Sequence, residues 1–111
     1  FDLGNLSLRL KETTSLSVKV IDQDSLIVSG AEVWLYNNRN IMSIDSVGIL
    51  SVKNGLTNNK GMVIFPNMSL FNYFMKISYQ TTDTSFIYQD TMGFQLRENE
   101  LNERIGILEI N

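Results

Sequence analysis

The residues that most often carry enzyme chemistry are missing or scattered in this chain. It has 111 residues and contains no His and no Cys, which excludes imidazole bases, thiol nucleophiles and the usual zinc ligands. Carboxylates remain, and the candidate pair is Asp22 and Asp24. Two residues apart in a turn-forming stretch, they are expected to accept hydrogen bonds from backbone amides rather than to act as a glycosidase pair. The sequence therefore predicts no enzyme activity and no cofactor.

A calcium site has one candidate position, the stretch that holds Asp22 and Asp24. Their oxygens could bind Ca²⁺ together with those of Asp45 or Asp90. Calcium loops, however, carry a dense run of oxygen ligands, a Gly at the sharp turn and a distal bidentate Glu. Because this stretch has no such pattern, we expect a solvated turn and no metal site.

The charge and the apolar pattern limit the classes of partner. The chain has 9 basic and 12 acidic residues and a formal net charge of −3. Nucleic acids and anionic lipids attract proteins with a surplus of Lys and Arg, so neither is expected as a partner. No apolar run approaches the ~18–20 residues of a membrane span. Because residue 1 is Phe rather than Met, we expect a mature or shortened chain whose targeting segment has been removed.

Apolar and polar residues alternate along most of the chain, which is typical of strands with one buried face. Turn-forming residues separate these stretches at intervals of about 8–12 residues, as in sandwiches and barrels. We predict an all-β chain: a single Greek-key β-sandwich of about seven or eight strands over 16–111, preceded by an N-terminal strand or tether at 1–15. The residues expected to fill its core are Val18, Val20, Val33, Leu35, Val63, Phe65, Tyr73, Met75 and Ile77.

The stretch near the C-terminus could be a helix or a strand. Leu96, Leu101, Ile105 and Leu108 have approximate helical spacing, and residues 97–104 are rich in charge. The β-branched residues beyond this stretch favour a strand. We expect a polar connection followed by a last strand in which Ile105 and Ile107 belong to the alternating apolar set.

Four short sequence elements occur in an order that resembles a known family. They read LSVKVID at 16–22, SGAEVWLY at 29–36, GLTNNKGMVIF at 55–65 and YFMKI at 73–77. This order is similar to the transthyretin-like (prealbumin-like), carboxypeptidase-regulatory-like β-sandwich domains. The chain departs from the family pattern at Asn58, where Asp is more frequent, and in having no Pro before Gly30. The long segment between Tyr36 and Gly55 resembles that of small exported lipoproteins of Bacteroidetes.

The resemblance implies a function without catalysis. It leads us to expect an exported accessory or adhesion-type binding module, a periplasmic, outer-membrane or cell-surface lipoprotein with a protein or glycan partner. Its only link to a membrane would be a lipid anchor upstream of Phe1. The alternative is a structural spacer or assembly subunit that acts by strand addition or by contacts within a homo-oligomer.

The outer face of one predicted sheet offers the most informative candidate site. If Ala31, Val33 and Leu35 point inward, large apolar side chains on the same strand and its neighbours point outward. An exposed group of this size exceeds the scattered apolar residues that monomers tolerate. Either the segment 41–52 folds over this face, or the face is a contact surface for a protein or a glycan. The candidate contact residues are Trp34, Tyr36, Phe74 and Ile64.

Three short motifs are candidates for modification. Asp24-Ser25-Leu26, Asp45-Ser46-Val47 and Asp90-Thr91-Met92 match the acceptor pattern of Bacteroidetes O-glycosylation, in which Asp-Ser or Asp-Thr precedes an apolar residue. Asp-Ser and Asp-Thr are also common turn pairs. The pattern therefore makes Ser25, Ser46 and Thr91 candidate acceptor sites.

Overall fold

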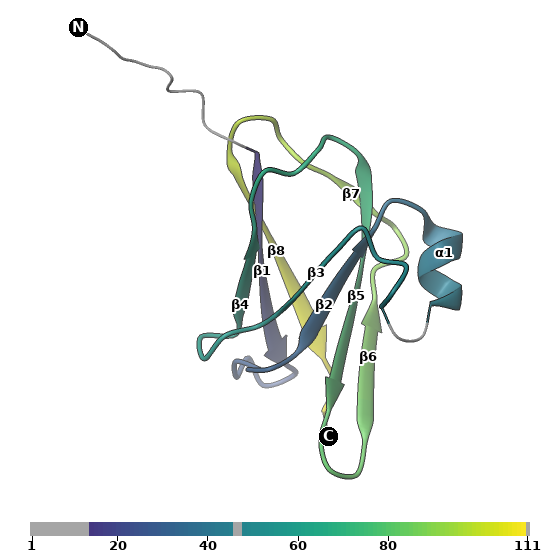
Figure 1. The fold of residues 1–111 in the computed structure, drawn as a ribbon. Helices are drawn as coiled ribbons and strands as arrows, with labels where there is room; N and C mark the ends of the chain where they lie inside the picture. The colour runs from purple at the N-terminus through teal and green to yellow at the C-terminus, as the bar shows by residue number, and fades with distance from the viewer. Residues whose placement is uncertain (1–13, 46–47, 111) are drawn as a thin grey trace, which may run out of the picture.

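The structure is a computed structural model that describes residues 14–45 and 48–110. Within these ranges the chain forms strands and one short helix (Figure 1). They are β1 (Ser15–Asp22), β2 (Glu32–Tyr36), α1 (Arg39–Ile44), β3 (Lys53–Leu56), β4 (Met62–Phe65), β5 (Asn72–Gln80), β6 (Ser85–Gln89), β7 (Phe94–Gln95) and β8 (Leu101–Leu108). The predicted all-β fold class is confirmed. Of the predicted N-terminal strand or tether, residues 1–13 lie outside the described residues.

The strands form two sheets that pack face to face. One sheet has the order β4-β1-β8, in which β1 runs antiparallel to β4 and parallel to β8. The other has the order β3-β2-β5-β6, and β7 also pairs with β5. The chain passes from one sheet to the other after β1, β3, β4 and β7, so each sheet is assembled from segments distant in sequence.

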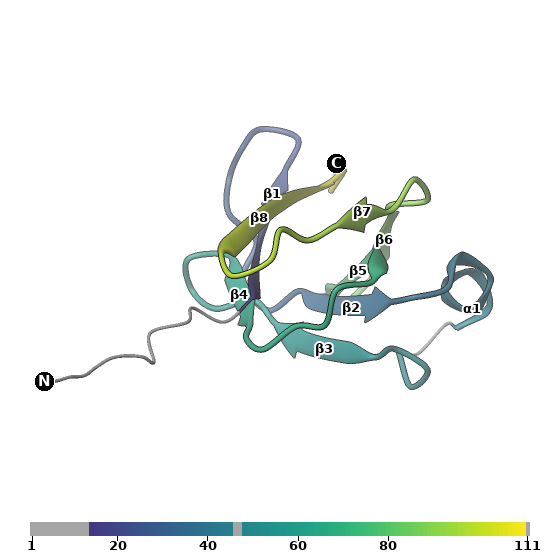
Figure 2. The ribbon, with the colours of Figure 1, turned by 90° about the horizontal axis from the view of Figure 1, so that it is seen from above.

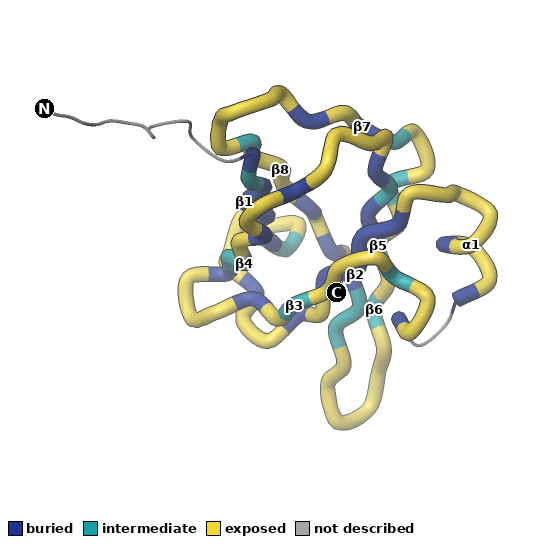
Figure 3. The backbone as a smooth tube through the Cα atoms, turned by 45° about the horizontal axis from the view of Figure 1, so that its top comes forward, coloured by how far each residue is buried: buried dark blue, intermediate teal, exposed yellow. Residues whose placement is uncertain are grey.

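The main core lies between the two sheets. Val18 and Val20 of β1 face Val33 and Leu35 of β2, and all four side chains are fully buried. Figure 3 shows the buried positions along the strands and the exposed turns at their ends. The other predicted core residues are buried as well, except for Val63, which is half-buried against the same cluster.

A second, smaller core lies on the outer face of the β3-β2-β5-β6 sheet. There α1 packs its buried Met42 against Trp34 and Tyr36 of β2, with Phe74 of β5 beside them. The helix begins after Asn38, whose side chain accepts hydrogen bonds from the backbone N–H groups of residues 40 and 41. Such a cap satisfies amides that have no partner within the helix. None of the described helices is long and apolar enough to cross a bilayer.

The turn before β4 has the backbone geometry that its sequence predicts. Gly61 has φ +73°, a left-handed conformation that costs glycine little. The side-chain oxygen of Asn58 accepts hydrogen bonds from the N–H groups of Lys60 and Met62. The turn thereby holds β3 and β4 together at one side of the sandwich.

The two sides of the sandwich differ. Seen from above, β3 and β4 lie at one side, and β7 and β8 lie at the other (Figure 2). At the first side Gly55 of β3 is so close to Val63 of β4 that an added methyl group would collide with it. At the second side, the edge strand β8 of one sheet faces the edge formed by β6 and β7 of the other, and no strand of the described residues lies between them.

Candidate functional site

The predicted contact surface around Trp34 is not exposed, and this part of the prediction is wrong. Trp34 keeps 4% and Tyr36 keeps 1% of its surface accessible. Both point away from the main core, as the alternation predicts, but α1 and the residues that follow it cover them. Of the two alternatives that the sequence left open, the structure therefore has the one in which the segment after Tyr36 covers this face.

The remaining two contact candidates do not join Trp34 and Tyr36 in a surface. Phe74 is half-buried beneath the same cover. Ile64 is 57% exposed, but it belongs to β4 in the other sheet. It lies in one row with Ser17 and Glu103 on the outer face of that sheet. The four residues are thus divided between two faces of the sandwich.

The carboxylate of Asp45 ties the covering segment to β2. It accepts a hydrogen bond of 2.7 Å from the Tyr36 hydroxyl, and others of 3.1 and 2.9 Å from the N–H groups of Gly48 and Leu50. From β5, the ammonium of Lys76 donates to the main-chain oxygens of Asp45 (2.6 Å) and Met42 (3.2 Å). These buried polar groups supply partners for one another, which indicates a structural role for the cluster.

The environment of Tyr36 also changes its acidity. Burial raises the pKa of its phenol, and the hydrogen bond to the Asp45 carboxylate and the negative charge of that group raise it further. The phenol therefore stays protonated at neutral pH and acts as a hydrogen-bond donor, which suits anchoring and not proton transfer.

The other acidic candidates cap turns. One oxygen of Asp22 accepts hydrogen bonds from the N–H groups of Asp24 and Leu26, at 2.8 and 3.0 Å. Asp90 does the same for the N–H groups of Met92 and Gly93. Among the described residues, no three His, Cys, Asp or Glu side chains gather as a metal site would require. The structure thus places these carboxylates where the turn interpretation predicts.

Two of the three candidate acceptor residues lie within the described residues. Ser25 lies in an exposed turn, with φ +66°. Thr91 is exposed in the connection between β6 and β7. Ser46 lies outside the described residues. A transferase could reach the first two side chains, and their modification stays a prediction.

The free edge of β8 is a feature that the sequence does not reveal. In the described part of the chain, β8 pairs only with β1. Neighbouring residues of a strand direct their N–H and C=O groups to opposite sides, so half of these groups on β8 face away from β1. Edges of this kind are templates for pairing with another chain unless they are blocked. At eight residues β8 is a long edge, and Glu103 and Arg104 are the charged residues that it carries.

The isoleucines of β8 point away from the main core. Ile105 and Ile107 are 58% and 50% exposed, and Gly106 and Leu108 face the core in their place. Gly106 is needed there because Ile77 of the opposite sheet occupies the space that a side chain would fill. The alternation in the sequence was correct, but the apolar pair of isoleucines lies on the outer face.

Two hollows follow β8 along the open side of the sandwich. One, of about 630 Å³, lies between Phe86 and Tyr88 of β6 and Ile107 of β8. The other, of about 420 Å³, lies between Leu96, after β7, and the first half of β8. Arg104 lines the second hollow and reaches across to β7, with its guanidinium 4.4 Å from the centre of the Phe94 ring. Together these two hollows and the β8 edge are named the open-edge groove.

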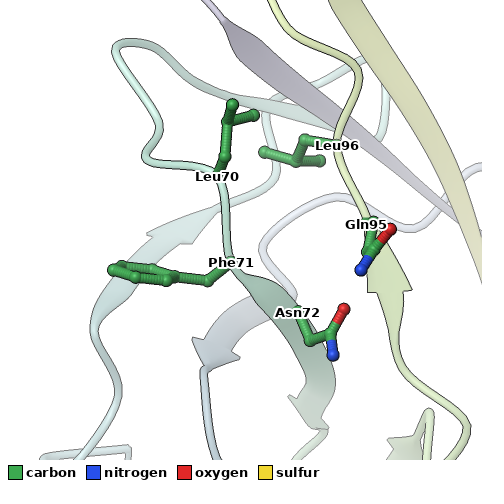
Figure 4. A pocket seen from close by; sticks show the side chains of 5 residues that line it. All are labelled: Leu70, Phe71, Asn72, Gln95 and Leu96. Atoms are coloured by element: carbon green, nitrogen blue, oxygen red, sulfur yellow. The ribbon is translucent and has the colours of Figure 1, made fainter.

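A third hollow continues the groove at the β7 end. Its walls are Leu70, Phe71 and Asn72 on one side and Gln95 and Leu96 on the other (Figure 4). Leu70 and Leu96 point toward each other, whereas Phe71 points away from them. With apolar and amide walls and no ionisable group, it suits contact with another polypeptide better than catalysis.

Comparison with known proteins identifies a fold and no family. No family model matches the chain, and no curated protein matches it. Among solved structures it is similar to BcpA, the major pilin subunit of Bacillus cereus, with a TM-score of 0.62 and 18% sequence identity. The match covers 88% of this chain and 30% of the pilin. At this identity the likeness shows a shared β-sandwich fold, and the chain corresponds in length to less than a third of the pilin.

Proposed function

We propose that this chain is a non-enzymatic module of an exported or cell-surface assembly, and that it binds a protein partner through the open-edge groove. The free edge of β8 carries this proposal. An extended segment that joins such an edge forms main-chain hydrogen bonds, and hollows beside the edge select its alternate side chains. β8 and the groove offer both kinds of contact.

The use of the carboxylates supports a function without catalysis. Asp22, Asp45 and Asp90 accept hydrogen bonds from backbone amides that hold turns. If one of these carboxylates were used in another way, the backbone amides that it holds would lose their hydrogen-bond acceptor. The open-edge groove brings together apolar and aromatic side chains with charged ones such as Glu103 and Arg104, and an apolar patch with a polar rim is typical of protein contacts.

An assembly subunit accounts for the structure better than an adhesion module does. The adhesion hypothesis relied on an exposed aromatic face at Trp34 and Tyr36, and these residues are covered. The fold shared with a pilin subunit is compatible with a place in a surface assembly. Export, a lipid anchor and kinship with transthyretin-like domains belong to the same proposal.

Photo-crosslinking in the native host tests this function. A photoreactive amino acid is placed at Ile107, in the groove, and in a matched variant at Lys60, in the exposed turn before β4. We expect a covalent protein adduct from position 107 and little or none from position 60. Equal adducts at both positions, or none at position 107, would contradict a contact site at the β8 edge.

A further inference from the structure

We infer that the partner in the open-edge groove is the segment 6–10 of a second copy of this chain, which pairs as an added strand with β8. This inference rests on the proposed function, because it names the partner of the same edge. It makes the chain self-assembling: each copy offers a groove and a segment that fits the groove of the next copy.

The groove sets clear requirements for a strand that enters it. One side of the strand must be apolar, because it meets Phe86 and Tyr88 of β6 and Leu96 after β7. The other side continues the outer face of the β4-β1-β8 sheet, where Glu103 is exposed beside Ile105 and Ile107, so polar residues can stay in contact with solvent there. An alternation of period two satisfies both requirements.

The segment 6–10 has this alternation. It reads Leu-Ser-Leu-Arg-Leu, so Leu6, Leu8 and Leu10 fall on one side of an extended strand and Ser7 and Arg9 on the other. Its five residues span ~17 Å as a strand and fit within the eight residues of β8. It lies before β1 and outside the described residues.

The charges of the two edges are complementary. With the leucines directed into the groove, Arg9 and Lys11 lie on the outer side of the added strand. The groove carries Glu103 on β8 and Glu109 just beyond it, on the outer side of the edge, whereas Arg104 is directed to the Phe94 ring. Cross-strand pairs of opposite charge favour pairing, whereas like charges oppose it. The basic outer side of the segment therefore suits the two carboxylates on the outer side of the edge, Glu103 and Glu109.

The position of Thr14 indicates that the segment comes from another copy. Its main-chain oxygen accepts a hydrogen bond from Met68 N–H, and its hydroxyl oxygen accepts one from Asn99 N–H in the turn before β8. To reach the far edge of β8 in its own molecule, the chain would have to reverse around that turn within residues 11–13. These are Lys, Glu and Thr, with none of the Gly, Pro or Asn that favour tight reversals.

Disulfide trapping tests the pairing directly, because the natural chain contains no Cys. Ser7→Cys is made in one chain and Ile107→Cys in a second chain that carries a size tag, and the two are mixed under mild oxidation. Both positions face outward in the inferred arrangement, where neighbouring strands bring side chains close enough for a disulfide. We expect a mixed disulfide, and much less of it when the second chain carries Lys60→Cys.

Two outcomes would overturn the inference. If Ser7→Cys gave the same yield of mixed disulfide with Lys60→Cys as with Ile107→Cys, the segment would not select the β8 edge. In a single chain that carries both Ser7→Cys and Ile107→Cys, an internal disulfide that outcompetes the mixed one would show that the segment folds back on its own molecule. If either occurs while the photoreactive residue at position 107 still captures a different protein, the proposed function stands and only the identity of the partner is wrong.

A matched pair of segment variants gives a second readout. Leu8→Asp places a carboxylate on the apolar side, and burial of an unpaired charge should lower the yield of mixed disulfide about tenfold. Leu3→Asp adds the same charge outside segment 6–10 and should leave the yield near that of the unsubstituted segment. Equal losses in both variants would attribute the effect to net charge, which would contradict insertion of Leu8.

Discussion

The hydroxyl of Tyr36 lies 2.7 Å from a carboxylate oxygen of Asp45, and this pair fastens the segment after α1 to the outer face of β2. The same carboxylate holds the N–H groups of Gly48 and Leu50. A sheet face that would expose Trp34 and Tyr36 thereby becomes a second core. The pair also explains why aromatic residues on the outward side of β2 do not form a contact surface.

Tyr36→Phe should lower the free energy of unfolding and should make that free energy less sensitive to alkaline pH. Loss of the bond to Asp45 should cost about 1.5–3 kcal/mol at neutral pH, as for hydrogen bonds to charged groups. Because folding raises the pKa of Tyr36 above its ordinary value of 10.0, its contribution is complete below about pH 10 and is lost at higher pH. Denaturant unfolding between pH 7 and 11 measures both effects.

The variant should therefore lose less stability than the natural protein as the pH rises. Some loss should remain, because burial also raises the pKa values of Tyr73 and Tyr88. Parallel stability curves for the two proteins above pH 10 would contradict the assigned role of the Tyr36 phenol.

Trp34→Ala should cost about 3–5 kcal/mol of unfolding free energy, the usual loss for a buried large aromatic. The reason is that the indole is buried beneath α1 and lies against Met42. Association measured by sedimentation should not change, since the ring is not at the surface. Phe71→Ala is the control: Phe71 is 53% exposed, and its loss should cost much less. A weaker association with unchanged stability would restore Trp34 as a contact residue.

Gly48→Ala should destabilise the protein more than Gly30→Ala does. Both glycines have φ near +80°, at +83° and +80°, so both substitutions incur similar backbone strain. Only at Gly48 does the added methyl group meet the Trp34 indole, whereas no atom lies within 4 Å of it at Gly30. The difference should be about 1–3 kcal/mol, as for other overpacked sites. Equal melting temperatures for the two variants would mean that the cover over Trp34 is loose.

If Ser25 or Thr91 carries an O-glycan, the protein purified from its native host should have a mass above that of the unmodified chain. Ser25 and Thr91 are exposed, so a transferase can reach them. Intact-mass measurement should show added sugar, and Ser25→Gly or Thr91→Val should remove one increment each if that residue is an acceptor. Glycine replaces Ser25 because the site has φ +66°, which glycine adopts without strain. An unmodified native mass would leave Asp24-Ser25 and Asp90-Thr91 as turn pairs only.

Local pattern alone was sufficient to predict β1, β2, β5 and most of the main core. Val18 and Val20 alternate with polar residues, and so do Val33 and Leu35; the side chains of a strand point to alternate faces, so the buried set follows directly from the pattern. The composition by itself likewise excludes His and Cys chemistry. These properties depend on residue type and on neighbours close in sequence.

Tertiary structure decided which outer faces are covered. The six residues of α1 are too few for a helix that is stable by itself, so it exists because Met42 packs on Trp34 and Asp45 bonds to Tyr36. The apolar pattern of residues 39–44 does not by itself predict this helix. On β8 the alternation was visible, but whether Ile105 or Gly106 faces inward depends on Ile77 in the opposite sheet.

The open-edge groove also arises only in the folded chain. Strand order depends on pairings between distant segments, such as Leu16 with Phe65 and Ser15 with Leu101. A strand's own residues do not tell whether one or both of its edges are paired, because the hydrogen-bonding groups belong to the backbone and are the same in every strand. The sequence by itself therefore favoured a strand over the second half of β8, and only the packing of the two sheets decided that its outer edge has no partner strand among the described residues.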